Sequence, residues 1–309
     1  MKRSVLLLIV AVLIFSLSAC GDPVGEGREE SIYVRLGSGA IGSSYTEWQI
    51  DLLAADGVTE YVCSGEYTLS KNGKRGDVFS VEPEESITYI NGYLSDRGFV
   101  SIIAKSGERL VGYSIVKFET DLRVYGKKYC MSASIVKTRS FTEDESPAIT
   151  KEQVDSLIAA EIRAENKRDQ RTVSFHRWSV ALSWNPNMIR FLEIDGVTEY
   201  SWQLVKVDGL KVENVTEKKT QYPGDEIGCY HQVLNSEGAY MTVIVKNGEA
   251  IVGYTVVKFV DAVKTAYVPI IKKSVIFTDD ELGVGVTPEQ VGVMINTTLP
   301  NQKMGQRTK

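Results

Sequence analysis

The sequence predicts an α+β fold that is mainly antiparallel β. It is expected to comprise two tandem homologous domains, each a β-sheet or sandwich-like unit closed by a C-terminal helix. Three observations predict this: short segments recur in the same order along the chain, each copy contains a hairpin pattern, and each copy ends in a helix-start signal. With 309 residues, the chain has room for two such domains.

The repeat consists of four pairs of matching segments. These are DGVTEY (56–61 and 195–200), SGERLVGYSIVKF (106–118) with NGEAIVGYTVVKF (247–259), FTEDE (141–145) with FTDDE (277–281), and TKEQV (150–154) with TPEQV (287–291). The second copies follow the first by 139, 141, 136 and 137 residues. A period this long is that of a domain rather than of a solenoid repeat. We therefore expect repeat domain 1 at 32–170, repeat domain 2 at 171–300 and a polar tail at 301–309.

Each copy contains a predicted β-hairpin. In the second copy Asn247 and Gly248 separate two apolar runs, and Asn-Gly favours a type I′ turn, in which both central residues have positive φ. Such a turn pairs Lys246 with Glu249 across the strands, and the first copy places Lys105 opposite Glu108 in the same way. A further strand is expected after each hairpin, at 129–141 and 266–277.

Each copy then begins a helix. Thr150 to Gln153 and Thr287 to Gln290 both fit the capping box, and Pro288 occupies the favoured first helical position. The charged run at 163–171 is expected to connect the two domains.

The first residues form an export signal. Lys2 and Arg3 precede an apolar run, Val5 to Phe15, that is shorter than the ~20 residues of a membrane-spanning helix. Leu17-Ser18-Ala19-Cys20 follows and resembles a bacterial lipobox. An uncleaved anchor helix is the alternative interpretation.

The resemblance to bacterial lipoproteins has consequences for the mature chain. It implies removal of a signal peptide at 1–19, lipid attachment at Cys20, and a location on the extracytoplasmic face of the cell membrane. Residues 20–31 contain three glycines and one proline, so they are expected to form a flexible tether after the lipidated cysteine.

Charge and cysteine spacing exclude some classes of partner. The formal net charge is −5 with a pI near 5.4, which gives no basic footprint for nucleic acid. The remaining cysteines, Cys63, Cys130 and Cys229, lie in no metal-ligand spacing. A Cys63–Cys130 disulfide and buried free thiols are both left open.

A glycine motif follows the first expected strand. Gly37, Gly39 and Gly42 form GxGxxG, and a helix-like QIDLLAAD and Asp56 follow, as in a dinucleotide-binding turn. The second copy lacks the motif and no second βαβ unit follows, so we expect a flexible loop and no cofactor.

Two acidic clusters precede the helices. Weak Ca²⁺ candidates are Glu143, Asp144, Glu145, Asp279, Asp280 and Glu281. No EF-hand spacing is present, and negative charge also suits the start of a helix. We therefore predict no metal.

Two residue types remain as candidates for function. The histidines, His176 and His231, have no counterpart in the first copy and adjoin no nucleophile motif, so no catalytic residue is assigned. Trp178, Trp184 and Trp202 cluster in the second copy and form a candidate binding surface, with core packing as the alternative.

These observations favour a non-catalytic binding or scaffolding module on a lipid anchor. Its ligand, whether protein, glycan or small molecule, is not specified by the sequence. The alternatives are a solute-binding subunit of a transporter and, third, an extracytoplasmic envelope hydrolase.

Overall fold

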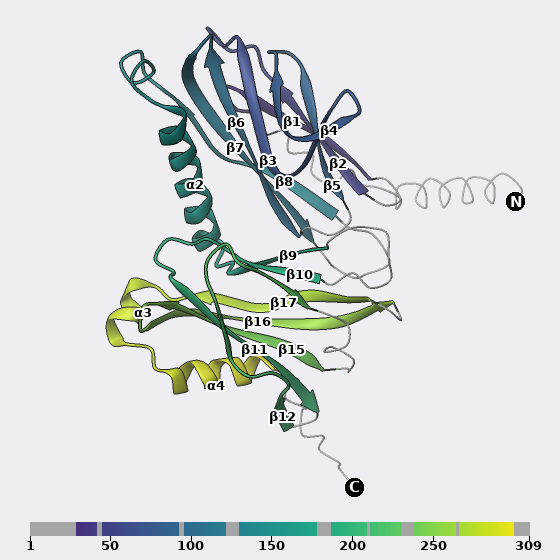
Figure 1. Cartoon of the computed structure of the whole chain (residues 1–309), viewed down its shortest axis with the longest axis vertical. Coiled ribbons are helices and arrows are strands. Elements are labelled where there is room, and N and C mark those ends of the chain that lie inside the picture. Colours follow the sequence, from purple (N-terminus) through teal and green to yellow (C-terminus); the bar gives the residue numbers. More distant parts are fainter. Residues whose placement is uncertain are drawn as a thin grey trace, which may run out of the picture. The chain divides into compact units, whose positions relative to one another are not determined.

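The computed structural model describes residues 29–41, 45–92, 96–121, 130–177, 187–208, 211–229, 238–263 and 266–299. The predicted signal peptide, the lipobox and the polar tail lie outside these residues. Within them the fold is mainly antiparallel β with few helices, as the sequence predicts (Figure 1).

Contacts within the chain define two compact units. Unit 1 comprises Met1–Gly92, Val100–Asp121 and Tyr129–Pro147, and unit 2 comprises Tyr93–Phe99, Leu122–Lys128 and Ala148–Lys309. The grouping places helix α2 (Lys151–Arg168) in unit 2, whereas the sequence places this segment at the end of the first domain.

Unit 1 is an eight-stranded antiparallel assembly. Its strands are β1 (Val34–Ile41), β2 (Tyr45–Leu52), β3 (Glu60–Lys71), β4 (Lys74–Val81), β5 (Ser86–Gly92), β6 (Arg97–Ser106), β7 (Arg109–Asp121) and β8 (Cys130–Ser140). They follow the order β1-β2-β5-β3-β6-β7-β8, and β4 pairs with β3 off this path. One buried cluster joins side chains of β1, β2 and β5 to side chains of β3, β6 and β7, because alternate residues of each strand face inward.

Unit 2 has two sheets and a covering helix. β14 (Glu226–Cys229), β10 (Asn187–Phe191) and β9 (Val173–Arg177) form the smaller sheet. The larger sheet has the order β12 (Lys211–Asn214), β11 (Glu199–Asp208), β15 (Ala239–Asn247), β16 (Ala250–Val263) and β17 (Ala266–Ile276), with β13 (Lys219–Gln221) also on β11.

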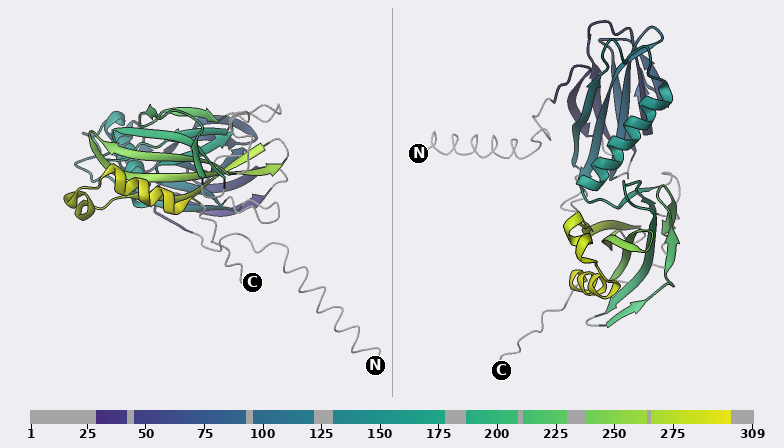
Figure 2. Two further views of the ribbon diagram at one scale, coloured as in Figure 1. Left: turned by 90° about the horizontal axis from the view of Figure 1, so that it is seen from below. Right: turned by 90° about the vertical axis from the view of Figure 1, so that its left-hand side faces the viewer.

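Apolar side chains fill both sides of the larger sheet in unit 2. One cluster joins it to β9 and β10. A second, on the opposite face, packs Val291, Ile295 and Leu299 with Tyr254, and Figure 2 shows helix α4 (Pro288–Thr298) lying along that face. The short helix α3 (Asp279–Val284) precedes α4.

The helix starts are those the sequence predicts, because a capping box is a local signal. Thr150 and Thr287 each accept a hydrogen bond from the backbone N–H three residues later, and the glutamine at that position bonds back. A third box, Thr278 with Glu281, starts α3 and was not recognised in the sequence.

The hairpin register differs from the prediction. Asn247 pairs with Ala250 and Lys246 with Ile251, so the turn is Gly248-Glu249 and not Asn247-Gly248. Gly248 has φ +57° while Glu249 is not in the positive-φ region, which is the pattern of a type II′ turn with glycine first. The Lys246 ammonium pairs instead with Glu199 on the neighbouring strand, at 2.8 Å.

Specific contacts recur at corresponding sequence positions in the two units. The Tyr61 hydroxyl donates to the carbonyl oxygen of Leu53 (2.7 Å), and the Tyr200 hydroxyl donates to that of Leu192 (2.5 Å). Further such pairs are Lys105–Glu60 (2.9 Å) with Lys246–Glu199 (2.8 Å), Gly107 N–H to Thr59 Oγ1 (2.9 Å) with Gly248 N–H to Thr198 Oγ1 (2.8 Å), and Ser114–Thr138 (2.8 Å) with Thr255–Ser274 (2.6 Å).

Candidate functional site

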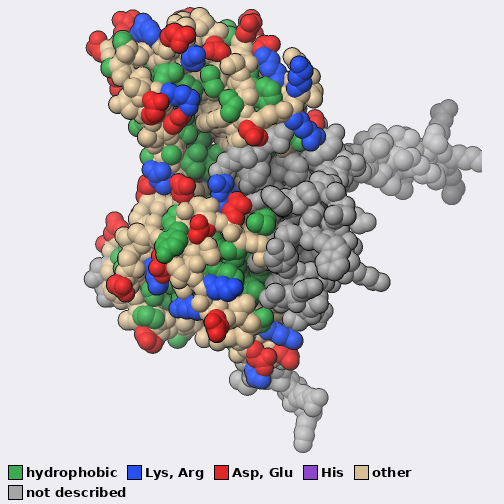
Figure 3. Space-filling model, in the orientation of Figure 1, with side chains coloured by type: hydrophobic (Ala, Val, Ile, Leu, Met, Phe, Trp, Pro, Cys, Tyr) green, Lys and Arg blue, Asp and Glu red, His purple; other side chains and the backbone are tan. Residues whose placement is uncertain are grey.

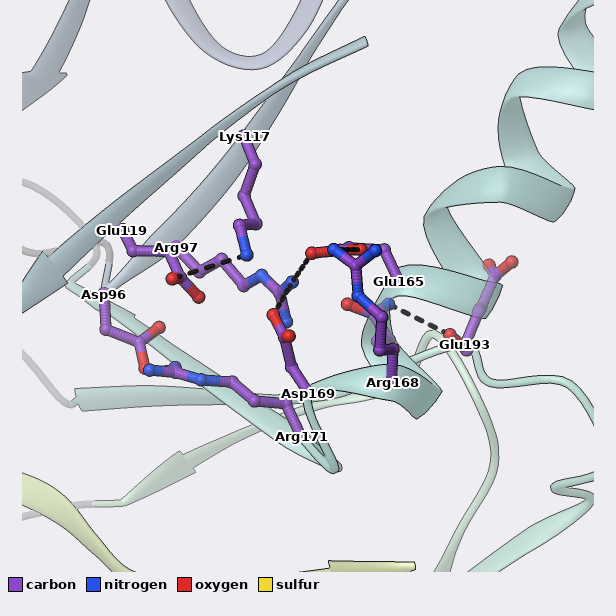
Figure 4. Close-up of polar contacts among 10 residues, drawn as sticks. Asp96, Arg97, Lys117, Glu119, Glu165, Arg168, Asp169, Arg171 and Glu193 are labelled. Atoms are coloured by element: carbon purple, nitrogen blue, oxygen red, sulfur yellow. Dashed lines mark hydrogen bonds and ion pairs between the residues drawn. The ribbon is translucent and has the colours of Figure 1, made fainter. Parts of the chain in front are cut away.

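A buried cluster of charged side chains lies in unit 2 at the end of α2. The ionic cluster comprises Asp96, Arg97, Glu165, Arg168, Asp169 and Arg171 (Figure 4). The Arg97 guanidinium lies 2.8 Å from a carboxylate oxygen of Asp169 and 3.8 Å from one of Glu165. The side chains of Arg97 and Glu165 are each 2% exposed, so this pair is removed from water.

Asp96 joins the first residues of β6 to β9. Its carboxylate accepts a hydrogen bond from the backbone N–H of Phe175 (2.9 Å) and pairs with Arg171 (2.5 Å). Its own N–H donates to the Phe175 carbonyl oxygen (3.0 Å). Burial raises the pKa of Asp96, and the Arg171 guanidinium and the Phe175 N–H act against that rise.

Further polar contacts extend the cluster along α2. The Asn166 amide donates to the Glu193 carbonyl oxygen (3.1 Å), and Arg163 pairs with Asp195 (2.9 Å). These contacts tie the last turns of α2 to the loop between β10 and β11.

The composition of the ionic cluster limits its chemistry. It contains three carboxylates and three guanidinium groups, each carboxylate within an ion pair. Guanidinium groups stay protonated, so they neither take up nor release protons near neutral pH. The arrangement therefore suits a structural role within unit 2, holding the segment of Asp96 and Arg97 to α2 and β9, better than a centre for acid–base catalysis.

This cluster is not apparent from the sequence. The charged run at 163–171 predicts a connector between the domains, whereas Glu165 and Asn166 are each only 3% exposed. The capacity for helix-end salt bridges was visible there, but Asp96 and Arg97 lie some 70 residues away, and no local pattern connects the two segments.

Of the predicted aromatic surface, the structure describes one member. Trp202 is 6% exposed and belongs to the core between the sheets of unit 2, so it contributes no exposed ring. The Lys219 ammonium lies over it, 5.5 Å from the ring centroid. Trp178 and Trp184 lie outside the described residues.

Comparison of the two units explains why Trp202 is buried. Trp202 pairs with Lys219 across β11 and β13, and the corresponding pair in unit 1 is Cys63 with Phe79 across β3 and β4. A small thiol opposite a large ring in one unit is thus replaced by a large ring opposite a flexible lysine in the other. Cys63 and Trp202 are the buried members of the two pairs, whereas Lys219 is exposed.

Among the described side chains, no cysteine or histidine is a reactive group. Cys63 is a free thiol with no exposed surface, and burial raises its pKa to about 12, which keeps it protonated. Cys63 therefore forms no disulfide with Cys130. His176 lies in β9 and His231 outside the described residues, and the side chains of both, like those of Cys130 and Cys229, are not described.

The acidic clusters have structural roles at turns. Glu145 accepts a hydrogen bond from the Thr142 backbone N–H (3.0 Å) and pairs with Arg139 (2.8 Å). That backbone bond, more than the arginine, holds the pKa of Glu145 below its usual value. Glu281 caps α3 in the corresponding way, accepting from the Thr278 N–H (2.7 Å).

The other acidic residues of these clusters are exposed. They are Glu143, Asp144, Asp279 and Asp280. Within the described ranges, no group of three or more histidine, cysteine or acidic residues could hold a metal ion.

The glycine motif lies in a strand and not in a loop. Gly37 and Gly39 belong to β1, whose register shifts between Leu36 and Gly39. The first half of the helix-like segment at 49–56 lies in strand β2, and the second half lies in the turn that follows. Gly42 lies outside the described residues. Two antiparallel strands cannot form the strand–turn–helix that a dinucleotide phosphate needs, so that interpretation is wrong.

The surface and the comparisons add little to the site. Acidic and basic side chains are interspersed on the face of each unit shown in Figure 3. None of the described helices is long and apolar enough to cross a membrane.

No family model, curated protein or solved structure matches the chain.

Proposed function

We propose that the chain is a lipoprotein anchored to the extracytoplasmic face of the cell membrane. In this proposal it acts as a non-catalytic binding or scaffolding module built from a duplicated β-rich domain, 32–170 and 171–300. The observation that carries the duplication is the recurrence of the same tyrosine-to-carbonyl bond, Tyr61 to Leu53 and Tyr200 to Leu192, at a spacing of 139 residues.

Strand order supports the duplication. β3, β6, β7 and β8 are consecutive neighbours in unit 1, and β11, β15, β16 and β17 are consecutive neighbours in unit 2. The two cross-strand pairs Cys63–Phe79 and Trp202–Lys219 lie at corresponding positions, and Cys63 and Trp202 are both buried.

The anchor is supported by the sequence alone. Leu17-Ser18-Ala19-Cys20 follows a basic and then an apolar segment. Two similar modules on one tether add avidity for a repetitive partner, because the second contact becomes intramolecular.

The contacts of the described carboxylates favour binding over catalysis. The carboxylates of the ionic cluster face guanidinium groups, and those of Glu145 and Glu281 cap turns. A solute-binding subunit usually relies on βα units, and the described sheets are antiparallel. An envelope hydrolase would need its acid and base among residues that the two copies do not share.

The test is complementation of a strain that lacks the gene. The double variant His176→Ala, His231→Ala should restore the wild-type phenotype, since a histidine is the usual proton carrier near neutral pH. A chain in which residues 1–20 are replaced by a cleavable secretory signal without a lipobox, made at the same level, should restore it poorly, because the mature chain would leave the membrane. Restoration by this unanchored chain together with failure of a folded histidine variant would show that a soluble enzyme, and not an anchored module, does the work.

A further inference from the structure

Strand β4 forms an edge of the sheet in unit 1. It pairs with β3 and with no other strand that the structure describes. Residues 74, 75, 77 and 78 are exposed, and the side chain of Val78 is 61% exposed. The outer backbone groups of an edge strand have no partner within the sheet, so they can pair with a further strand.

The turn before β4 fixes the direction of these backbone groups. Asn72 and Gly73 have φ values of 53° and 77°, as in the type I′ turn of a two-residue hairpin, and Lys71 pairs with Lys74 across that turn. The two residues that close such a turn exchange backbone hydrogen bonds with each other.

Hydrogen bonding then alternates along β4. Gly76, two residues after Lys74, bonds toward β3, where it pairs with Leu69. The alternation directs the N–H and C=O groups of Arg75 and Asp77 outward. Since these two residues are two apart in a strand, their side chains lie on one face. The outer edge of β4 therefore presents backbone donors and acceptors together with one cation and one anion.

The two charges on this edge are not neutralised by described neighbours. Arg75 and Asp77 form no ion pair with the residues that the structure describes. In unit 2 the edge strand β12 has opposite charges at the same spacing, but there Lys211 and Glu213 pair with each other. The edge of β4 thus retains a cation and an anion for a partner, and the edge of β12 does not.

We propose that β4 pairs with β4 of a second copy of the chain, antiparallel and with the two-fold axis at Gly76. Arg75 of each copy then lies opposite Asp77 of the other, so an ion pair forms on each side of the axis. The outward N–H and C=O groups of these residues hydrogen-bond across the interface. The aliphatic part of Lys74 covers the exposed Val78 of the other copy.

Charge complementarity selects this partner and this register. Moving one strand by two residues places Arg75 opposite Arg75 or Asp77 opposite Asp77, and like charges directly opposite each other are destabilising. A shift of one residue sets the outward backbone groups of one strand against residues of the other that bond toward β3, so the hydrogen bonds are lost.

The experiment measures self-association of the chain from Gly21 onward by sedimentation equilibrium. This chain lacks Cys20, so the result does not depend on lipid attachment. An edge contact this short belongs to the weak class of interfaces, so the protein concentration should extend to about 1 mM. A monomer–dimer equilibrium is expected.

Charge exchange tests the register. Arg75→Asp and Asp77→Arg should each weaken the dimer about tenfold, because each replaces both ion pairs by like-charge pairs. The double variant Arg75→Asp, Asp77→Arg re-forms the ion pairs in the opposite sense and should restore the dissociation constant to within about twofold. The matched controls Arg109→Asp and Asp144→Arg, at exposed positions outside β4, should behave like the unchanged chain.

Four results would overturn the proposal. They are a monomer at every concentration, a dimer that neither single variant weakens, single variants that weaken it without restoration by the double variant, and equal weakening by the controls. Circular dichroism of each variant shows that the fold is kept, so a loss of the dimer reports on the edge of β4.

Discussion

Replacing Trp202 by alanine should destabilise unit 2, and the folded variant should bind a partner as the unchanged chain does. The side chain is 6% exposed and packs between the two sheets, where a tryptophan buries about 150–250 Å². At about 25 cal/mol per Å² this area corresponds to about 4–6 kcal/mol as an upper bound, and measured truncations of buried aromatics cost about 3–5 kcal/mol. We expect a loss of about 3–5 kcal/mol in the free energy of unfolding.

The assay is urea unfolding of the chain from Gly21, followed by far-ultraviolet circular dichroism because the substitution removes a fluorophore. The midpoint of the transition that includes unit 2 should fall by on the order of 1–3 M. Trp202→Phe should cost less, because the indole N–H has no hydrogen-bond partner among the described contacts and only volume is lost. Tyr222→Ala, at a side chain that is 60% exposed, should change stability by less than about 0.5 kcal/mol.

The opposite pattern would refute the reasoning. If Trp202→Ala kept the wild-type midpoint while weakening attachment to a partner, Trp202 would have to be an exposed contact residue. Trp202 would then belong to the candidate binding surface predicted from the sequence, with Trp178 and Trp184.

Three further predictions follow from the described contacts. Asp96→Ala should lower stability by about 3–5 kcal/mol in urea unfolding, because it leaves Arg171 and a buried N–H without their carboxylate; a change below about 1 kcal/mol would contradict the pairing. Tyr61→Phe and Tyr200→Phe should each cost about 0.5–1.5 kcal/mol and by similar amounts, since each removes the same hydroxyl-to-carbonyl bond; a clear cost in only one of them would argue against equivalent positions. Cys20→Ser should leave the precursor uncleaved and without label after growth with a radioactive fatty acid, and persistent label would refute lipid attachment at Cys20.

Local features of the fold were predictable from the sequence. The capping boxes at Thr150 and Thr287 depend on residues three apart, and both helices start there. The hairpins at Gly107 and Gly248 were also predicted, but in a register one residue away. Their turns are fixed by a bond to a threonine on a third strand, which the local pattern does not contain.

Long-range features were not predictable from one sequence. Cys63 and Trp202 occupy corresponding places, and each is buried in a cluster of side chains from several strands that are far apart in the sequence. The segment QIDLLAAD at 49–56 looks helical in the sequence, yet residues 49–52 belong to a strand because partners on both sides hydrogen-bond to it. The ionic cluster likewise joins segments that share no local pattern.

The central claim is that the anchored, duplicated module acts by contact and not by catalysis. The most direct measurement is release of soluble fragments from purified cell-envelope material incubated with the chain from Gly21 at neutral pH. The account predicts no release above the buffer control, and the same value for the His176→Ala, His231→Ala variant. Release that rises with protein concentration and disappears in that variant would contradict it and identify the chain as an envelope hydrolase.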